Sequence, residues 1–493
     1  MSSPIDTPVP IPLESPSTPP AGSPVRTGLH VAIIGGGPGG YEAALVAAQL
    51  GAVVTVIEEH GMGGSAVLTD VVPSKTLIAT AEWMTLTESA TELGIYAGDG
   101  ALRVDMGQVN ARVRALAVQQ SRDIAARLER EGIRVIAGRA QLCGTKGARH
   151  RVAVTGETCE ELVADIVLIA TGATPRELPD AQPDGEVILT WKQLYHLKAL
   201  PEHLIVVGSG VTGAEFAGAY HQLGTRVTLI SSRDRVLPGE DEDAANLIEN
   251  VFRRRGMTVL SRSRAQAVTR CGDGVEVRLT DGRTVTGSHC LMAVGAVPNT
   301  RDLGLEAAGV NMRESGHINV DRVSRTTAFG IYAAGDCTGV YPLASVAAMQ
   351  GRIAMWHALG DAVAPLSLEA VAANIFTTPE IATIGVTQAD IDSGRVAGDV
   401  TRLPIPRNPR AKMLGIKEGF VKVFSDSHSG VVIGAVIVAP RASELIFPLT
   451  IAVTHRLTVD EIANVFTIYP SLSGSLGEAA RMLHQVDDED FFE

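Results

Sequence analysis

The chain has 493 residues, of which 45% are hydrophobic and 20% are charged, so it has apolar material for several hydrophobic cores. Its formal net charge of −13 argues against a nucleic-acid partner, because proteins that bind a phosphate backbone usually present a basic surface. No apolar run is long enough to span a bilayer, and the five cysteines form no close pair, a spacing that suits neither a metal site nor a secreted disulfide framework. We therefore expect incidental thiols in a reducing, cytoplasmic compartment.

The N-terminal segment differs from the rest of the chain. Residues 1–27 contain eight prolines and few apolar side chains, and no basic region is followed by an apolar core as in a secretory signal. A segment of this composition cannot bury enough surface to order itself. We expect a disordered tail.

A complete strand–helix–strand unit follows. Its parts are a strand over residues 30–34, glycines at 35, 37 and 40, a helix over 41–50, a strand over 53–57 and Glu58. The glycines allow a tight turn and the close approach of a pyrophosphate to the helix N-terminus. Glu58 lies 18 residues past Gly40, where an acid can bind the ribose hydroxyls of a dinucleotide. The unit predicts a dinucleotide site.

The same unit recurs later. It consists of a strand over residues 204–207, glycines at 208, 210 and 213, a helix over 214–223 and a strand over 226–230. This strand ends on Ser231 rather than on an acid, and Arg233 and Arg235 follow. An acid would repel a 2′-phosphate, whereas Ser and Arg can hold one. The second nucleotide could therefore be NADPH or either nicotinamide form, although the arginines could equally be solvated surface residues.

Three further segments bring the chain past these sites. Two strands run into A-T-G at Gly172 and A-V-G at Gly295, each followed by a proline. A third strand, Gly330 to Ala334, runs into Gly335-Asp336, which suits a carboxylate that binds a polyol. Residues 343–358 have helical spacing, so the N-terminus of that helix could stabilise negative charge on a cofactor.

These motifs, in this order and at these distances, resemble the pyridine nucleotide-disulfide oxidoreductase family, from about Leu29 to the C-terminus. Residues 376–385, which read F-T-T-P-E-I-A-T-I-G, resemble the start of that family's dimerisation domain. The resemblance implies an α/β fold with two Rossmann-like dinucleotide-binding domains and a C-terminal α+β dimerisation domain. It implies an FAD-binding domain over 28–185 and 306–365, an NAD(P)-binding domain over 186–305 and a dimerisation domain over 366–493.

The redox-active segment of the family departs from its pattern here. The family reads G-G-[ST]-C-x-x-x-x-C-x-P-S-K, and the two cysteine positions hold Ala66 and Val71, neither of which can form a thiolate or a disulfide. The family's C-terminal His-Pro is Tyr469-Pro470, and Gly474 stands where the family has a Glu. The acid–base pair that serves a leaving thiolate is therefore absent.

One functional pair of the family is retained. Lys75 follows the altered cysteine motif, and Glu215 lies two residues after Gly213. In the family these positions form an ion pair beside the reactive flavin nitrogen. Here the pair would help the flavin accept hydride, although it could also be purely structural.

The resemblance thus implies an enzyme that oxidises NADH or NADPH, passes hydride to FAD and reduces a quinone-type acceptor without disulfide reductase activity. The chain looks like cysteine-less mycobacterial and actinobacterial members that behave as quinone reductases. Two alternatives remain: a soluble pyridine nucleotide transhydrogenase, and a non-catalytic flavoprotein sensor or scaffold. The expected assembly is a homodimer in which Tyr469 of the partner's C-terminal domain completes the site.

The candidate residues fall into three groups. The catalytic candidates are Lys75, Glu215 and Tyr469. The FAD candidates are Gly35, Gly37, Pro38, Gly40, Glu58, Gly64, Ser65, Lys75, Thr171, Gly172, Asp336 and Ala344. The NAD(P) candidates are Gly208, Gly210, Val211, Gly213, Ser231, Arg233 and Gly295.

Overall fold

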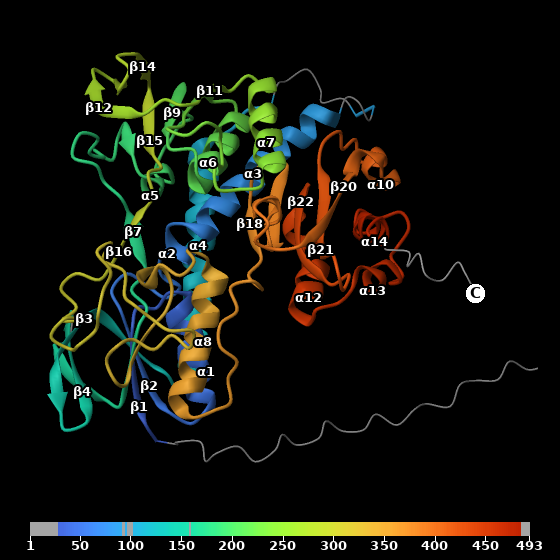
Figure 1. The fold of residues 1–493 in the computed structure, drawn as a ribbon. Coiled ribbons are helices and arrows are strands. Elements are labelled where there is room, and N and C mark those ends of the chain that lie inside the picture. Colours follow the sequence, from blue (N-terminus) through green and yellow to red (C-terminus); the bar gives the residue numbers. More distant parts are fainter. Residues whose placement is uncertain (1–27, 91–93, 96–101, 157–158, 485–493) are drawn as a thin grey trace, which may run out of the picture.

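The computed structural model describes residues 28–90, 94–95, 102–156 and 159–484. The tail expected over residues 1–27 lies outside this part of the chain. Within the described ranges, no helix combines the length and the apolar character needed to cross a membrane. The described residues form three lobes, each built on its own sheet (Figure 1).

The first lobe is built on a seven-stranded sheet in the order β17-β6-β1-β2-β3-β4-β5. Its elements are β1 (His30–Ile34), α1 (Pro38–Gln49), β2 (Val53–Glu58), α2 (Gly64–Leu68), α3 (Val71–Ala90), α4 (Met106–Arg130), β3 (Arg134–Lys146), β4 (Arg149–Gly156), β5 (Glu160–Ala164), β6 (Ile166–Ile169), β17 (Ile331–Ala333), η2 (Asp336–Thr338) and α8 (Ala344–Leu359). The strands from β17 to β3 pair in parallel. Parallel pairing brings the carboxyl ends of β1, β6 and β17 to one edge of the sheet.

Two helices of this lobe pack unusually closely. A Cβ added to Gly351 of α8 would lie 2.0 Å from the carbonyl oxygen of Gly39 in α1. Only glycine allows the two backbones to approach this far. The contact holds the first turn of α1 against the middle of α8, and the two helices lie side by side in Figure 1.

The second lobe is built on a five-stranded parallel sheet in the order β11-β10-β9-β15-β8 and a three-stranded sheet, β12-β13-β14. Its elements are β8 (Ile188–Leu189), α5 (Trp191–Leu194), β9 (His203–Val207), α6 (Val211–Gln222), β10 (Arg226–Ile230), α7 (Glu242–Arg254), β11 (Thr258–Leu260), β12 (Ala265–Cys271), β13 (Gly274–Leu279), β14 (Thr284–Gly287) and β15 (His289–Met292). A two-stranded link, β7 (Ala173–Pro175) with β16 (Ala296–Pro298), joins it to the first lobe.

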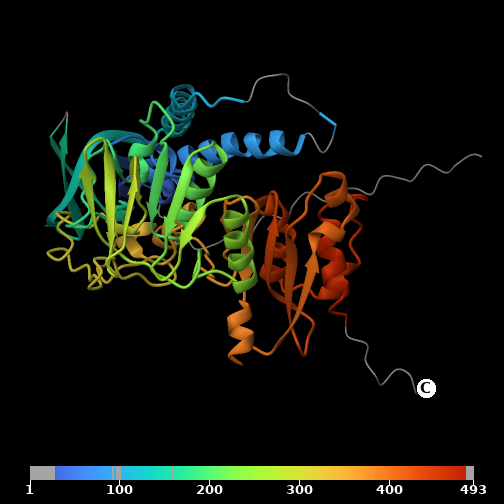
Figure 2. The same cartoon turned by 90° about the horizontal axis from the view of Figure 1, so that it is seen from above.

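The third lobe is an antiparallel sheet in the order β18-β19-β22-β21-β20, covered by short helices. Its elements are β18 (Ala373–Ile375), β19 (Glu380–Gly385), α9 (Gln388–Asp392), β20 (Gly398–Pro404), η3 (Ile405–Arg407), α10 (Pro409–Met413), β21 (Phe420–Asp426), β22 (Val432–Ala439), α11 (Ala442–Leu445), α12 (Phe447–His455), α13 (Val459–Ala463) and α14 (Gly474–Arg481). Seen from above, it lies beside the other two lobes, with α7 against it (Figure 2).

The predicted α/β class and the three-part organisation are confirmed. The expected domain limits stay a prediction. Among the described strands, every sheet except the β7–β16 link uses strands from within one predicted domain, and that link pairs a strand of the predicted FAD-binding domain with one of the predicted NAD(P)-binding domain. The expected starts of two helices are wrong by three residues. Helix α1 begins at Pro38 and α6 at Val211, because the third glycine of each motif belongs to the first helical turn. In α1 the first helical residue is a proline, which has no N–H that would need a partner.

Candidate active site

The first glycine loop leaves one open position between two crowded ones. A Cβ on Gly35 would lie 2.3 Å from the Ala170 carbonyl oxygen, and a Cβ on Gly40 would lie 1.9 Å from that of Gly35. Gly37 caps the N-terminus of α1, and no described atom lies within 4 Å of where its Cβ would be. The outer glycines therefore serve packing, while Gly37 leaves space above the N-terminus of a 12-residue helix, which suits a phosphate.

Glu58 ends the second strand beside this loop. Its carboxylate accepts hydrogen bonds from the Gly36 N–H at 2.6 Å and the His60 N–H at 2.7 Å. These two bonds hold the side chain at the carboxyl edge of the sheet and leave lone pairs free. A ribose diol placed along the edge would find an acceptor there.

The opposite end of this groove carries Asp336. Burial raises the pKa of this carboxyl, and the described residues give it no hydrogen bond or ion pair. Its turn is held by the buried Gln350, whose side-chain oxygen accepts from the Gly335 N–H at 2.9 Å. A partly buried carboxyl without a partner fits the polyol chain of a flavin nucleotide.

The other predicted FAD contacts lie in turns and helix ends of the same lobe. The Thr171 hydroxyl donates to the Asn299 carbonyl oxygen at 2.7 Å. In return, the Asn299 side-chain amide donates to the Thr171 carbonyl oxygen, and the Asn299 backbone N–H donates to the Gly172 carbonyl oxygen. Ala344 is the first residue of α8, whose N-cap makes no side-chain capping bond. Pro38 lies at the first turn of α1, and Gly64 packs against Gly37, with a Cβ added at Gly64 only 2.9 Å from the Gly37 Cα.

The second glycine loop repeats the arrangement of the first. A Cβ on Gly208 would lie 2.1 Å from the Ala293 carbonyl oxygen, and one on Gly213 would lie 1.8 Å from that of Gly208. Gly210 again has no described atom within 4 Å of its Cβ position, and Val211 beside it is 42% exposed. Gly295 follows β15 with a φ of 90° and open space around it. A second phosphate could therefore lie at α6.

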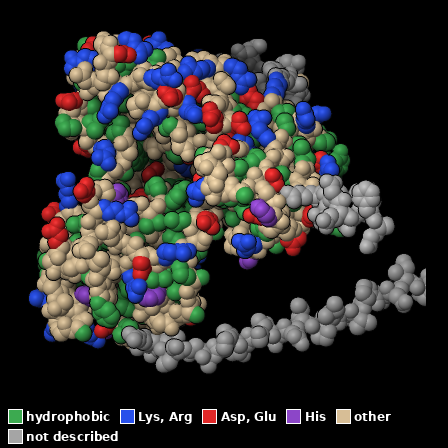
Figure 3. Space-filling model, in the orientation of Figure 1, with side chains coloured by type: hydrophobic (Ala, Val, Ile, Leu, Met, Phe, Trp, Pro, Cys, Tyr) green, Lys and Arg blue, Asp and Glu red, His purple; other side chains and the backbone are tan. Residues whose placement is uncertain are grey.

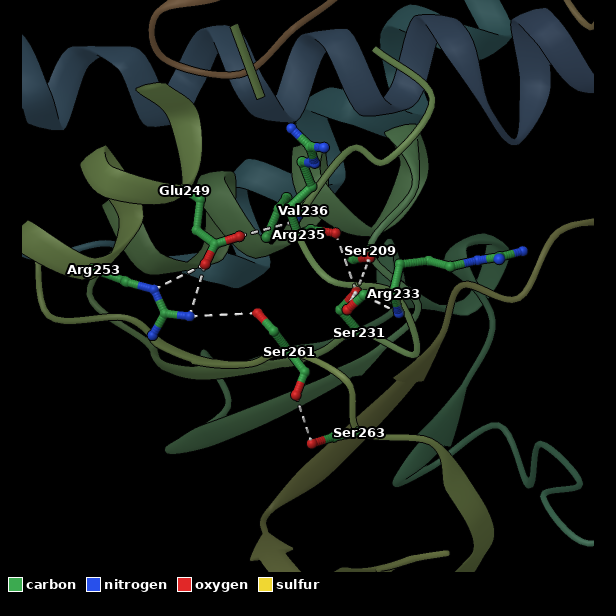
Figure 4. Close-up of polar contacts among 9 residues, drawn as sticks. All are labelled: Ser209, Ser231, Arg233, Arg235, Val236, Glu249, Arg253, Ser261 and Ser263. Carbon is green, nitrogen blue, oxygen red and sulfur yellow. Dashed lines mark hydrogen bonds and ion pairs between the residues drawn. The ribbon is translucent and has the colours of Figure 1, made fainter. Parts of the chain in front are cut away.

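The loop after β10 separates the two predicted 2′-phosphate ligands (Figure 4). The Ser231 hydroxyl is completely buried; it accepts from Ser209 at 2.7 Å and from the Arg233 N–H at 3.1 Å. It thus holds the loop together from inside. The Arg233 side chain is exposed and extends away from this cluster, and Arg235 pairs with Glu242 at 2.8 Å. Of the two predicted ligands, only Arg233 reaches outward.

The ion pair expected between Lys75 and Glu215 is present. Lys75 Nζ lies 2.8 Å from a Glu215 carboxylate oxygen, and the other oxygen accepts from the Phe376 N–H at 2.9 Å. Glu215 is 4% exposed and Lys75 is 26% exposed, and the ammonium lies 4.9 Å from the centre of the Phe376 ring. The pair therefore joins α3, α6 and the start of the third lobe, with its positive end reaching the groove.

The segment that would carry the cysteines is built as a turn between two helices. Ala66 lies in α2 and Val71 begins α3, and the N–H groups of Thr69 and Asp70 both donate to the Ser65 carbonyl oxygen. Neither side chain at positions 66 and 71 carries a polar atom. The turn is therefore built, and its two cysteine positions carry no sulfur.

Tyr469 lies in the third lobe and is 82% exposed. Among the described residues, no hydrogen bond joins its hydroxyl to Lys75 or Glu215, whose polar partners are each other and the Phe376 N–H. Gly474 begins α14 a few residues later. The neighbouring Phe466 and Ile468 are 102% and 81% exposed. The site role predicted for Tyr469 stays a prediction.

Two side chains near the ion pair were not found from the sequence. Asp70 lies in the α2–α3 turn, within electrostatic range of Lys75 and Glu215. Asn374 lies on β18 two residues before Phe376, and both polar atoms of its amide are buried without a partner among the described residues. An unpartnered buried amide is uncommon and suits a ligand that both donates and accepts. Neither belongs to a motif, so only the fold reveals them.

The residues present fit a flavin dinucleotide and a nicotinamide dinucleotide. The supporting observations are the two open glycines at helix N-termini, the acids at both ends of the first groove and the unpartnered amide of Asn374. Figure 3 shows a hollow between the first and second lobes. Among the described residues, no cluster of His, Cys, Asp and Glu could hold a metal ion.

Comparisons with known proteins agree with this geometry. A family model described as pyridine nucleotide-disulphide oxidoreductase matches residues 29–351, and the model of its dimerisation domain matches residues 371–480. A Mycobacterium tuberculosis protein named NAD(P)H dehydrogenase (quinone) is 56% identical over 469 residues, covering 94% of this chain and 95% of that protein. A dihydrolipoyl dehydrogenase of Chlorobaculum tepidum is 34% identical over 457 residues, covering 92% and 96%. The crystal structure of LpdA from Mycobacterium tuberculosis superimposes with a TM-score of 0.89 at 55% identity, covering 93% and 100%.

Proposed function

The chain belongs to the pyridine nucleotide-disulphide oxidoreductase family, and we propose that it transfers hydride from NADH or NADPH to FAD and then electrons to a quinone-type acceptor, without reducing disulfides. One observation carries this proposal. The Lys75–Glu215 pair is intact, while the cysteine positions beside it hold Ala66 and Val71. Such a site can receive a hydride but cannot relay electrons through sulfur.

The relatives support the acceptor. The Mycobacterium tuberculosis protein that carries the name NAD(P)H dehydrogenase (quinone) covers nearly the whole of this chain at 56% identity. Quinones need no thiol relay, because they accept electrons directly from a reduced flavin. A quinone therefore suits a site from which the sulfur has been removed.

The chain's own residues bind and orient the reactants. Gly37, Glu58 and Asp336 would hold the phosphate, ribose and polyol parts of FAD along the first groove. Gly210 would receive the pyrophosphate of the nicotinamide nucleotide, and Arg233 would receive a 2′-phosphate. When bound, FAD supplies the hydride chemistry that protein side chains lack.

Lys75 provides a fixed positive charge beside the site of hydride transfer. Glu215 holds the ammonium at 2.8 Å and is itself held by the Phe376 N–H. A charge fixed before the reaction stabilises negative charge that develops during it without reorganisation. The family's dimerisation domain implies a homodimer, in which the partner's Tyr469 would line the acceptor side of the site.

A steady-state screen tests the proposal. Quinones, lipoamide, glutathione disulfide, mycothione and an NAD⁺ analogue are each offered with NADH and with NADPH. Quinone turnover with no disulfide turnover is expected. Fast transhydrogenation with negligible quinone turnover would favour a transhydrogenase, and a flavin that neither nucleotide bleaches would favour a non-catalytic scaffold.

A further inference from the structure

The turn between α2 and α3 carries a carboxylate that nothing described so far uses. Asp70 precedes Val71, the first residue of α3, and its carbonyl oxygen accepts the first helical hydrogen bond from the Ser74 N–H at 2.8 Å. Asp70 therefore occupies the N-cap position of a 20-residue helix. A carboxylate in this position usually accepts from the N–H of the second or third helical residue.

Here that side chain makes no capping bond among the described residues, and the sequence removes one of the two usual donors. The third helical residue is Pro73, which has no N–H to donate. The described residues give the Asp70 carboxylate no hydrogen bond and no ion pair. Its nearest cation on the same helix, Lys75, is already paired with Glu215. Asp70 is thus a partly buried carboxyl group with free oxygens beside the reaction centre.

The charged groups around Asp70 come from four elements. Lys75 of α3 and Lys192 of α5 favour its ionised form, whereas Glu215 of α6 and Asp336 of η2 oppose it. The buried hydroxyl of Tyr195 lies beside Ser74 and within electrostatic range of Asp70. Asp70 is thus within electrostatic range of Asp336, at the proposed polyol end of the flavin site, and of Lys75, at its proposed reactive end, and it belongs to the segment of the missing cysteines.

We propose that Asp70 is the acid that gives a proton to the quinone-type acceptor as the electrons reach it. This role rests on the proposed function. The family's acid–base pair, which serves the leaving thiolate, is absent here, so direct reduction of a quinone calls for a proton donor elsewhere in the site. The carboxyl stands in the segment where the family's sulfur chemistry takes place, next to one of the two lost cysteine positions.

The reaction balances with one proton per turnover. NAD(P)H supplies two electrons and one hydrogen by way of the flavin, and the quinone needs two electrons and two hydrogens to become a hydroquinone. The second hydrogen is the proton of the Asp70 carboxyl, whose O–H bond breaks as an O–H bond forms on the acceptor oxygen. The Asp70 carboxylate then regains a proton from solvent.

The electrostatics of Asp70 agree with this role. Burial, opposed by Lys75 and assisted by Glu215, raises the pKa of Asp70 from 3.8 to about 6. An acid is most effective when its pKa is near the working pH. Burial raises the pKa of Tyr195 well above its ordinary value, so its hydroxyl stays protonated and can donate a hydrogen bond but is a weak acid.

The test separates steps that need a proton from steps that do not. The holoenzyme, D70N, D70E and D273N are reduced anaerobically with NADH and then mixed with menadione or with ferricyanide. Ferricyanide takes single electrons and no proton. Asp273 is an exposed carboxylate on the turn between β12 and β13, so D273N removes the same charge far from the site.

We expect D70N to slow reoxidation by menadione by about 100-fold or more at pH 6, which is the usual contribution of a general acid. D70E should recover part of the rate, D273N should match the wild type, and ferricyanide and NADH rates should not change. In the wild type, the menadione rate should fall about tenfold per pH unit above its midpoint near pH 6, and D70N should lose this dependence.

An infrared pH titration gives a readout independent of turnover. The wild-type holoenzyme should show a carboxyl band that titrates near pH 6 and that is missing from D70N. Menadione rates and pH profiles equal in wild type and D70N would overturn the role of Asp70 and leave the proposed function standing. A wild type that NADH reduces but no quinone reoxidises would overturn both. If D70N does not bind FAD, absence of the infrared step from the wild type would overturn the role of Asp70.

Discussion

The two open glycines provide a direct way to separate the two nucleotide sites. We consider Gly210→Ala first. Its backbone has φ −72° and ψ −171°, which an alanine adopts without strain, and no described atom lies within 4 Å of the new methyl group. The substitution should therefore leave the fold intact and place a methyl group where the nicotinamide nucleotide's pyrophosphate would lie.

The expected magnitudes differ between folding and binding. Gly→Ala at an N-cap loses a preferred residue but also reduces the entropy of the unfolded chain, so the net change in unfolding free energy should stay within about 1 kcal/mol. Forcing a methyl group into a filled site typically costs about 1–3 kcal/mol. That range corresponds to a roughly 5- to 150-fold weaker affinity for NAD(P)H.

Stopped-flow bleaching of the flavin against NADH concentration measures this affinity, with FAD content and Tm recorded for the same samples. Gly37→Ala is the matched control, because its methyl group is equally unobstructed but should expel FAD instead. Gly210→Ala with normal FAD, normal Tm and wild-type NADH affinity would refute the placement of the nicotinamide nucleotide at α6.

Four other predictions concern single side chains. Glu215→Gln should keep FAD but slow flavin reduction by NADH about 10- to 100-fold, because it leaves Lys75 without its counter-charge; an unchanged rate would make the pair structural. Arg233→Ala should raise KM for NADPH about tenfold and leave KM for NADH unchanged; equal effects on both would exclude a 2′-phosphate contact. Asp70 has its folded pKa raised from 3.8 to about 6, so its ionised form opposes folding; this cost is complete above pH 6, shrinks as the pH falls and vanishes below 3.8. Asp70→Asn should be more stable in urea by up to about 3 kcal/mol at pH 8 and by less than about 1 kcal/mol at pH 4; equal gains at both pH values would contradict this. Lys422→Met should cost about 3–5 kcal/mol of unfolding free energy, because the buried Lys422 pairs with the buried Asp241 at 2.8 Å; a loss below 1 kcal/mol in thermal or urea unfolding would contradict this.

The fold could be predicted from the sequence where a short local pattern, such as glycine spacing or an apolar run, by itself determines the backbone conformation. Glycine spacing and apolar strands gave β1, β2 and β10 with correct or nearly correct limits, because a phosphate-binding turn restricts the backbone at fixed offsets. The helix starts were placed too late because the last glycine of each motif lies inside the helix. The Lys75–Glu215 pair spans 140 residues and came from family resemblance rather than from local pattern.

The remaining site residues depend on tertiary contacts that a sequence does not show. Asp70 looks like an ordinary helix cap until the missing N–H of Pro73 and the pairing of Lys75 with Glu215 are considered together. Asn374 looks like one polar residue in an apolar strand until its amide is found buried and unpartnered. Ser231 looked like a phosphate ligand because it ends a strand, but its hydroxyl points into the loop.

The most direct test of the central claim is to reduce the holoenzyme anaerobically with one equivalent of NADH and then mix it with a single equivalent of acceptor. We predict that menadione reoxidises the flavin completely, with one hydroquinone formed per flavin, and that lipoamide, glutathione disulfide and mycothione leave it reduced. Reoxidation by any of these disulfides at a rate comparable to that with menadione would contradict the account.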